Sequence, residues 1–188
     1  MTIYVAWIGE TSEPARLVDG VAAALHREYL VAAHRLRIDD RPADAFDLSR
    51  QQHSSRTILA WLTGQLRDDE PDAKLLGVTD VDLFIPVLTF VFGEAQLGGQ
   101  AAVVSTARLR EPALESLVRA RLAKEAVHEV GHTFGLVHCA SPACVMARSP
   151  ALASVDVKED RLCSDCRIRY RDLRESSYVA ARPAHPNR

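Results

Sequence analysis

The chain has 188 residues, 47% of them hydrophobic, and a formal net charge of −2 at pH 7. This length supports a substantial core but makes two large domains improbable, so we expect one domain. The balanced charge lacks the basic excess of a nucleic-acid-binding protein or a polybasic membrane anchor, so we expect no nucleic acid and no membrane as partner.

The first nine residues lack the basic start, long apolar stretch and cleavage site of a signal peptide. They predict a strand over 2–9, with no inhibitory propeptide before it. No run approaches the roughly 18 apolar residues that cross a bilayer. We therefore expect a cytoplasmic protein, and we take it to be a monomer.

The next segment alternates between helix and strand patterns. Apolar residues at three- and four-residue spacing predict a helix over 14–30, with Ser12 as its cap. A short half-buried strand is predicted over 35–38. A second helix is predicted from Asp47 or Ser49 to about residue 67.

Three polar residues, Arg50, Gln52 and His53, lie near the start of this second helix. Arg50 and Gln52 are interpreted as polar residues on the helix surface, with contact to substrate or to the lobe edges as the alternative. His53 has no partner at ligand spacing and is given no metal role.

Three strands are predicted after an acidic turn, over 74–79, 86–94 and 100–105. Gly98 and Gly99 lie between the last two and predict a hairpin. Proline is tolerated only at the start of a strand or on an edge strand, so Pro86 supports 86–94 as the edge strand. The sheet should therefore be mixed and mostly parallel, with an antiparallel edge strand.

The third helix is predicted to begin at Glu111-Pro112 and to end at Gly135. Its apolar stripe comprises Leu114, Leu117, Val118, Leu122, Ala126 and Val130. We divide the domain, 1–175, into an upper lobe over 1–135 and a lower lobe over 136–175. The lower lobe is poor in apolar residues until a short helix that runs to about 174, so a metal is expected to organise it. Residues 176–188 are expected to be a disordered tail.

The end of the third helix contains the pattern His-Glu-x-x-His-x-x-Gly-x-x-His. His128 and His132 are four residues apart, so on a helix both can bind one zinc ion, with Glu129 beside the metal as general base. An unbroken helix would carry His138 to another face. A left-handed turn at Gly135 would bring it back as third ligand and leave a coordination position open for water. The alternative is a core helix with histidines at chance positions.

All four cysteines lie between residues 139 and 166. Cys139, Cys144, Cys163 and Cys166 fit a closed structural zinc site of four thiolates. Disulfides are disfavoured in a reducing cytoplasm, and a redox-active Cys163-x-x-Cys166 pair lacks the surrounding βαβ unit.

The long histidine motif followed by a methionine resembles the metzincins, and the added cysteines resemble the archaemetzincins in particular. Further similarity lies in Ser49-Arg50-Gln51-Gln52, in the run from Asp82 to Gly93, and in 98–109, so the resemblance covers about 1–175. It implies an α/β metzincin-like fold with two zinc ions per chain, one catalytic and one structural. It also implies a methionine turn at Met146 beneath the histidines, and an edge strand that pairs with substrate. Tyr170 is interpreted as a packing residue.

The expected function is zinc-dependent hydrolysis of a peptide or protein, in which Glu129 activates a zinc-bound water. The alternative is a catalytically silent, zinc-stabilised protein that binds peptides or partners. Endopeptidase or aminopeptidase action, side-chain preference and the physiological substrate stay open.

Overall fold

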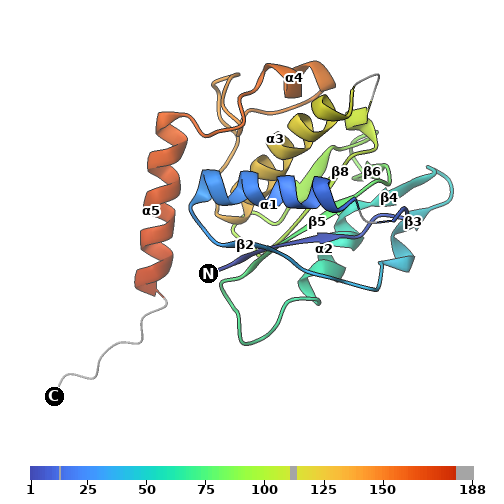
Figure 1. The fold of residues 1–188 in the computed structure, drawn as a ribbon, viewed down its shortest axis with the longest axis horizontal. Coiled ribbons are helices and arrows are strands. Elements are labelled where there is room, and N and C mark those ends of the chain that lie inside the picture. The colour runs from blue at the N-terminus through green and yellow to red at the C-terminus, as the bar shows by residue number, and fades with distance from the viewer. Residues whose placement is uncertain (13, 111–113, 181–188) are drawn as a thin grey trace.

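The fold is a central sheet with helices on both of its faces (Figure 1). The computed structural model describes residues 1–12, 14–110 and 114–180, with side chains to residue 176. The sheet has five strands in the order β2-β1-β5-β8-β7, all parallel to their neighbours except β7, which pairs antiparallel with β8. The strands are β1 (Ile3–Trp7), β2 (Ala33–Arg35), β5 (Lys74–Thr79), β7 (Gly93–Ala95) and β8 (Ala101–Ser105). The predicted mixed, mostly parallel sheet with an antiparallel edge strand is confirmed.

Both faces of the sheet are buried, as the apolar strands require. Successive side chains of a strand point to opposite faces, so Ile3 and Val5 join one cluster while Ala6 joins the other. Two helices, α1 (Ala15–Tyr29) and α3 (Glu115–Thr133), pack on the first cluster. The helix α2 (Ser55–Thr63) packs on the second.

The helix predicted from Asp47 or Ser49 begins only at Ser55, where Ser54 accepts a hydrogen bond from the Thr57 amide at 3.3 Å. The Asp47 carboxylate explains the difference, because it accepts hydrogen bonds from two following backbone amides and so stabilises a turn. The turn joins the short strands β3 (Phe46–Asp47) and β4 (Gln52–Ser54). With β6 (Leu83–Phe84) they form a second sheet, preceded by the 3₁₀ helix η1 (Ala43–Ala45).

The bounds of other helices and strands also differ from the prediction. The strand predicted over 35–38 lies at 33–35, paired with β1, and α1 is capped by Pro14 without a side-chain hydrogen bond, not by Ser12. Most of the strand predicted over 86–94 is irregular, and only 93–95 pairs in the main sheet.

Helix α3 begins at Glu115, with Leu114 as its cap. Leu114, which was predicted to belong to the apolar stripe, is 80% exposed. The predicted start at Glu111-Pro112 lies outside the described residues. Leu117 is also exposed, whereas the rest of the predicted stripe is buried. The 3₁₀ helix η2 (Arg108–Arg110) precedes this region.

The segment after residue 135 shares the main hydrophobic core, contrary to the expectation of an apolar-poor lobe. Val145, Met146, Val155 and Leu162 belong to the cluster that α1 and α3 also form. An additional helix, α4 (Leu152–Val157), precedes α5 (Ser164–Ala180), which stands at the end of α1 (Figure 1). Because α5 extends to Ala180, residues 176–180 are helical instead of part of a disordered tail, and 181–188 lie outside the described residues.

Tyr170 has the packing role that was predicted. It is buried, its hydroxyl donates to the Tyr29 carbonyl at 2.8 Å, and it contacts the rings of Tyr29 and Phe134. This contact joins α5 to the end of α1.

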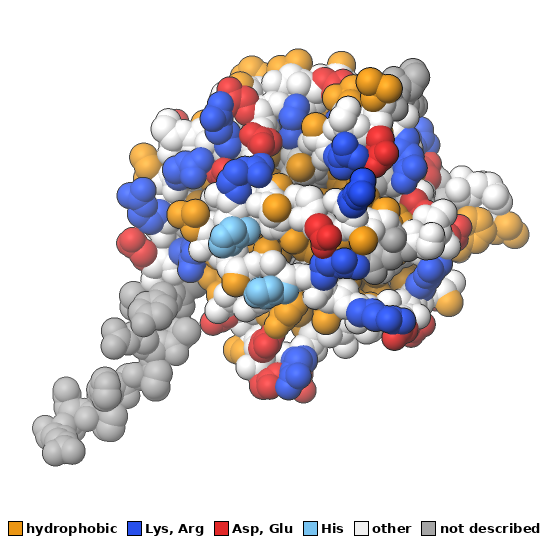
Figure 2. Space-filling model, viewed as in Figure 1, with side chains coloured by type: hydrophobic (Ala, Val, Ile, Leu, Met, Phe, Trp, Pro, Cys, Tyr) orange, Lys and Arg blue, Asp and Glu red, His pale blue; other side chains and the backbone are white. Residues whose placement is uncertain are grey.

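Acidic and basic side chains are interspersed on the face shown in Figure 2, as a net charge of −2 suggests. Within the described residues, no helix combines the length and apolar character needed to cross a membrane.

Candidate metal centre

The last turns of α3 bring His128 and His132 together with their Nε2 atoms 3.1 Å apart. Two nitrogens bound to one tetrahedral zinc at about 2.0–2.1 Å would be about 3.3 Å apart, so the pair fits this metal. Each Nδ1 lies beside a backbone carbonyl, at 2.8 Å from Val145 O and 2.7 Å from Leu136 O. A carbonyl only accepts hydrogen bonds, so each Nδ1 carries the proton and each Nε2 lone pair is available to a metal.

His138 reaches the same place because the helix stops before it. Regular α-helix ends at Thr133, and Gly135 has a φ of +91°, which confirms the predicted left-handed turn. The His138 ring lies 5.3 Å from the His128 ring and 4.9 Å from the His132 ring, between centroids. One ligand atom from each of the three residues lies within 4.8 Å of the others.

Burial sets the protonation of this group. It lowers the pKa of His128 well below the ordinary value, and it lowers the pKa values of His132 and His138. Neutral imidazole is the form that binds a metal. Burial, followed by the nearby charge of Glu125, raises the pKa of Glu129 well above that of an ordinary carboxyl group.

A cleft of about 440 Å³ opens above these residues. It is lined by His128 and Glu129, by residues of the irregular segment 85–93, and by 148–150, and we refer to the last two segments as its two walls. Two of the three histidines, His128 and His138, therefore border a space that a substrate can enter.

Met146 is fully buried next to the motif helix. A Cβ atom added at Gly131 would come within 2.6 Å of the Met146 sulfur, so the two residues are in close contact. The Met146 carbonyl accepts a hydrogen bond from the Cys139 amide at 2.9 Å, which ties this segment to the residue after His138.

The four cysteines form a second group, with one sulfur from each within 4.8 Å of the others. The Cys139 and Cys163 sulfurs are 3.8 Å apart. Four sulfurs at about 2.3 Å from a tetrahedral zinc would be about 3.8 Å apart, whereas a disulfide requires about 2.05 Å. The geometry thus fits the expected thiolate site. A hydrogen bond from the Cys166 amide lowers the pKa of Cys163, while burial raises the pKa values of Cys144 and Cys166.

The interpretation of Arg50 and Gln52 as polar residues on a helix surface is wrong for Gln52, whereas Arg50 is exposed as expected, although both residues precede helix α2. Gln52 is buried, and its amide nitrogen donates to Asp82 Oδ2 and to the Thr89 carbonyl, both at 2.9 Å. Arg50 donates to the Leu88 carbonyl at 3.2 Å. Both residues therefore support the cleft wall. The only signal in the sequence was their place in the stretch 49–52, which resembles the archaemetzincins.

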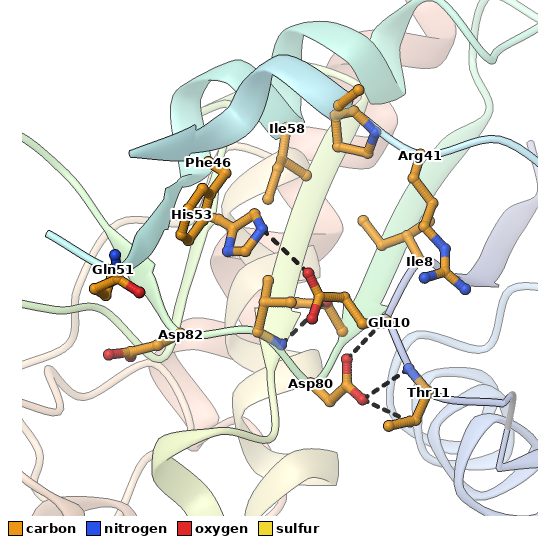
Figure 3. Close-up of a pocket in the computed structure, with 14 residues that line it drawn as sticks. Ile8, Glu10, Thr11, Arg41, Phe46, Gln51, His53, Ile58, Asp80 and Asp82 are labelled. Atoms are coloured by element: carbon orange, nitrogen blue, oxygen red, sulfur yellow. Dashed lines mark hydrogen bonds and ion pairs between the residues drawn. The ribbon is translucent and has the colours of Figure 1, made fainter. Parts of the chain in front are cut away.

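A separate cavity of about 660 Å³ lies at the carboxyl ends of β1 and β5. Figure 3 shows His53 directed toward Glu10, with the imidazole Nε2 3.6 Å from the carboxylate, and Asp80 accepting hydrogen bonds from Thr11. His53 thus lies in this cavity and not with either of the two metal-ligand groups found among the described residues.

Comparison with known proteins identifies the family. The sequence profile described as Peptidase family M54 matches residues 17–172. The archaemetzincin of Methanocaldococcus jannaschii is 40% identical over 138 residues, which are 71% of this chain and 74% of that protein. The archaemetzincin of Haloquadratum walsbyi is 35% identical over 174 residues, 88% of this chain and 97% of the relative.

A solved structure agrees with this assignment. The crystal structure of the archaemetzincin from Methanopyrus kandleri superposes with a TM-score of 0.79 at 34% identity, covering 93% of this chain and 96% of that one. The chain therefore belongs to peptidase family M54, the family of the archaemetzincins, and is a zinc metallopeptidase.

Proposed function

We propose that His128, His132 and His138 bind the catalytic zinc and that Glu129 is the general base. Cys139, Cys144, Cys163 and Cys166 would bind a second, structural zinc. The observation that carries the proposal is the meeting of three imidazoles, two of which line an open cleft together with the buried Glu129. When bound, the catalytic zinc would supply Lewis acidity, which polarises a carbonyl and lowers the pKa of water.

The chain's own residues would then orient the substrate and move the proton. Hydrogen bonds to Val145 O and Leu136 O hold two of the imidazoles in one tautomer. Glu129 would take a proton from the attacking water and pass it to the amine leaving group. Its raised pKa suits this role, because a more basic carboxylate accepts a proton more readily.

The substrate would be a peptide lying between the 85–93 wall and the 148–150 wall. In the proposed division into two lobes, residues 1–135 contribute the first of these walls and 136–175 the second, which supports a cleft between the lobes. Gly93, in the antiparallel edge strand β7, lines the cleft, consistent with an extended chain passing along this edge.

The test is cleavage-site profiling of the zinc-loaded protein on a diverse peptide pool, with Glu129→Ala as the control. We expect the wild type to cleave and Glu129→Ala to retain both metals without cleaving. Undiminished cleavage by the variant would refute the role of Glu129. Peptide binding without cleavage by the wild type would favour a silent binding protein instead.

A further inference from the structure

Arg148 occupies a distinctive place in the cleft. It lies in the 148–150 wall of the cleft, two residues after Met146, and its side chain is exposed. Among the described residues that line the cleft, it is the only lysine or arginine. A permanent positive charge therefore lies beside the histidine group.

The charge of Arg148 is not neutralised within the described part of the chain, where its guanidinium has neither a hydrogen bond nor an ion pair. The nearby Glu125 carboxylate is engaged elsewhere, since it lies 2.7 Å from the buried Lys158 ammonium. Arg148 and His138 line the same cleft, so the guanidinium shares the space that the proposed metal ligand borders.

Arg148 borders two hollows that both contain apolar residues. Leu88 and Phe90 line the metal-binding cleft together with Arg148. Arg148 also lines a second hollow of about 540 Å³ whose other residues include Pro142, Ala153 and Val157. Arg148 thus lines both the metal-binding cleft and an apolar hollow.

We propose that Arg148 is a specificity-determining residue that binds a carboxylate of the peptide substrate close to the scissile bond, with apolar residues of the peptide on either side. This inference rests on the proposed peptidase function. Guanidinium binds carboxylate through paired hydrogen bonds, and none of the described residues engages these donors of Arg148. The carboxylate can belong to an aspartate or glutamate side chain or to the free C-terminus of the peptide.

The experiment compares matched peptides on the zinc-loaded protein. One pair carries Glu or Gln near the cleaved bond and has an amidated C-terminus, and a second pair is neutral internally with a free or an amidated C-terminus. Because both members of a pair are cleaved by the same protein sample, the ratio of their kcat/KM values does not depend on the folded fraction.

We expect the wild type to prefer the acidic member of at least one pair by about three- to ten-fold, the range of an exposed ion pair strengthened by hydrogen bonds. Which pair shows the preference identifies the source of the carboxylate. Arg148→Gln should bring that ratio close to one, and Arg148→Glu should favour a lysine peptide over the glutamate peptide. Arg169→Gln removes the same charge from the exposed surface of α5, outside the cleft, and should keep the wild-type ratio.

Equal ratios in the wild type and Arg148→Gln, in both pairs, would overturn the inference while leaving the peptidase proposal intact. A failure of the peptidase proposal is distinguished by a binding measurement. Fluorescently labelled forms of the same peptides are bound to the zinc-loaded Glu129→Gln variant, with and without Arg148→Gln. Arg148-dependent preference in binding, with no cleavage by the wild type, would refute hydrolysis and support the assignment of Arg148.

Discussion

The ion pair between Lys158 and Glu125 allows the sharpest test of how the site is held. The Lys158 ammonium lies 2.7 Å from Glu125 Oε1, and the two side chains are 0% and 3% exposed. Lys158 also donates to the Ala147 carbonyl at 3.1 Å, and Glu125 accepts from the Ser149 hydroxyl at 3.2 Å. Since Glu125 is one helical turn before Glu129, the pair joins the proposed active-site helix to the segment 147–149.

The perturbation is Lys158→Met, which keeps a long apolar stem and removes the charge. It leaves a buried carboxylate with only a hydroxyl partner and a carbonyl without its donor. Removing one member of a buried pair costs about 3–5 kcal/mol of unfolding free energy. Glu125→Leu should lower the unfolding free energy by a similar amount, because it leaves the buried Lys158 ammonium without its carboxylate partner.

The double variant Glu125→Leu/Lys158→Met should lose less than either single variant, about 1–3 kcal/mol. Replacing both charges removes the need to bury either one, so the remaining cost is that of the unpaired Ala147 carbonyl and the Ser149 hydroxyl. The assay is urea unfolding of the zinc-loaded protein, followed by circular dichroism and by the fluorescence of Trp7 and Trp61. Losses in the double variant equal to the sum of the single variants would refute the coupling on which this reasoning depends.

A matched control is available on the surface. Arg161 lies 2.6 Å from Glu159, a comparable distance, but the two side chains are 64% and 51% exposed. Arg161→Met should therefore cost less than about 1 kcal/mol. A loss of 3 kcal/mol or more, on the order expected for the buried pair, would show that burial does not decide the energy of these pairs.

Three further predictions concern the end of α3 and the metals. Gly135→Ala should lower the free energy of unfolding by about 1–2 kcal/mol, because alanine is strained at a φ of +91° even though Leu173, at 3.5 Å, leaves room for the added methyl group. The strain should weaken zinc binding at the histidine site more than at the cysteine site. Equal metal retention at both sites would contradict this prediction. Lys74 donates to the Gly99 and Thr133 carbonyls at 2.6 and 3.0 Å. Lys74→Met should therefore lower the free energy of unfolding, measured in urea, by about 1–3 kcal/mol. An unchanged urea midpoint of unfolding would show that these hydrogen bonds do not stabilise the fold. A chelator should remove zinc from the open histidine site first, with loss of cleavage and little change in circular dichroism, and from the four thiolates later; loss of both metals in one step would argue against this order.

The sequence by itself determined the local parts of the site. The spacing of His128 and His132 depends only on the period of an α-helix, and the turn at Gly135 depends only on the backbone freedom of glycine. The apolar strands of the parallel sheet were equally predictable, since both of its faces had to be buried. Even the grouping of four cysteines could be inferred from their number and order.

Tertiary structure alone decided the supporting contacts. Lys158 meets Glu125 from 33 positions along the chain, as their numbering shows, and Gln52 reaches Thr89 from 37 positions away. No periodicity encodes such pairs, because they depend on how separate elements pack. The same reason explains why the segment after residue 135 could not be recognised as part of the main core. Its few apolar residues are insufficient alone, but Val145 and Val155 are buried once α1 and α3 supply the opposite surface.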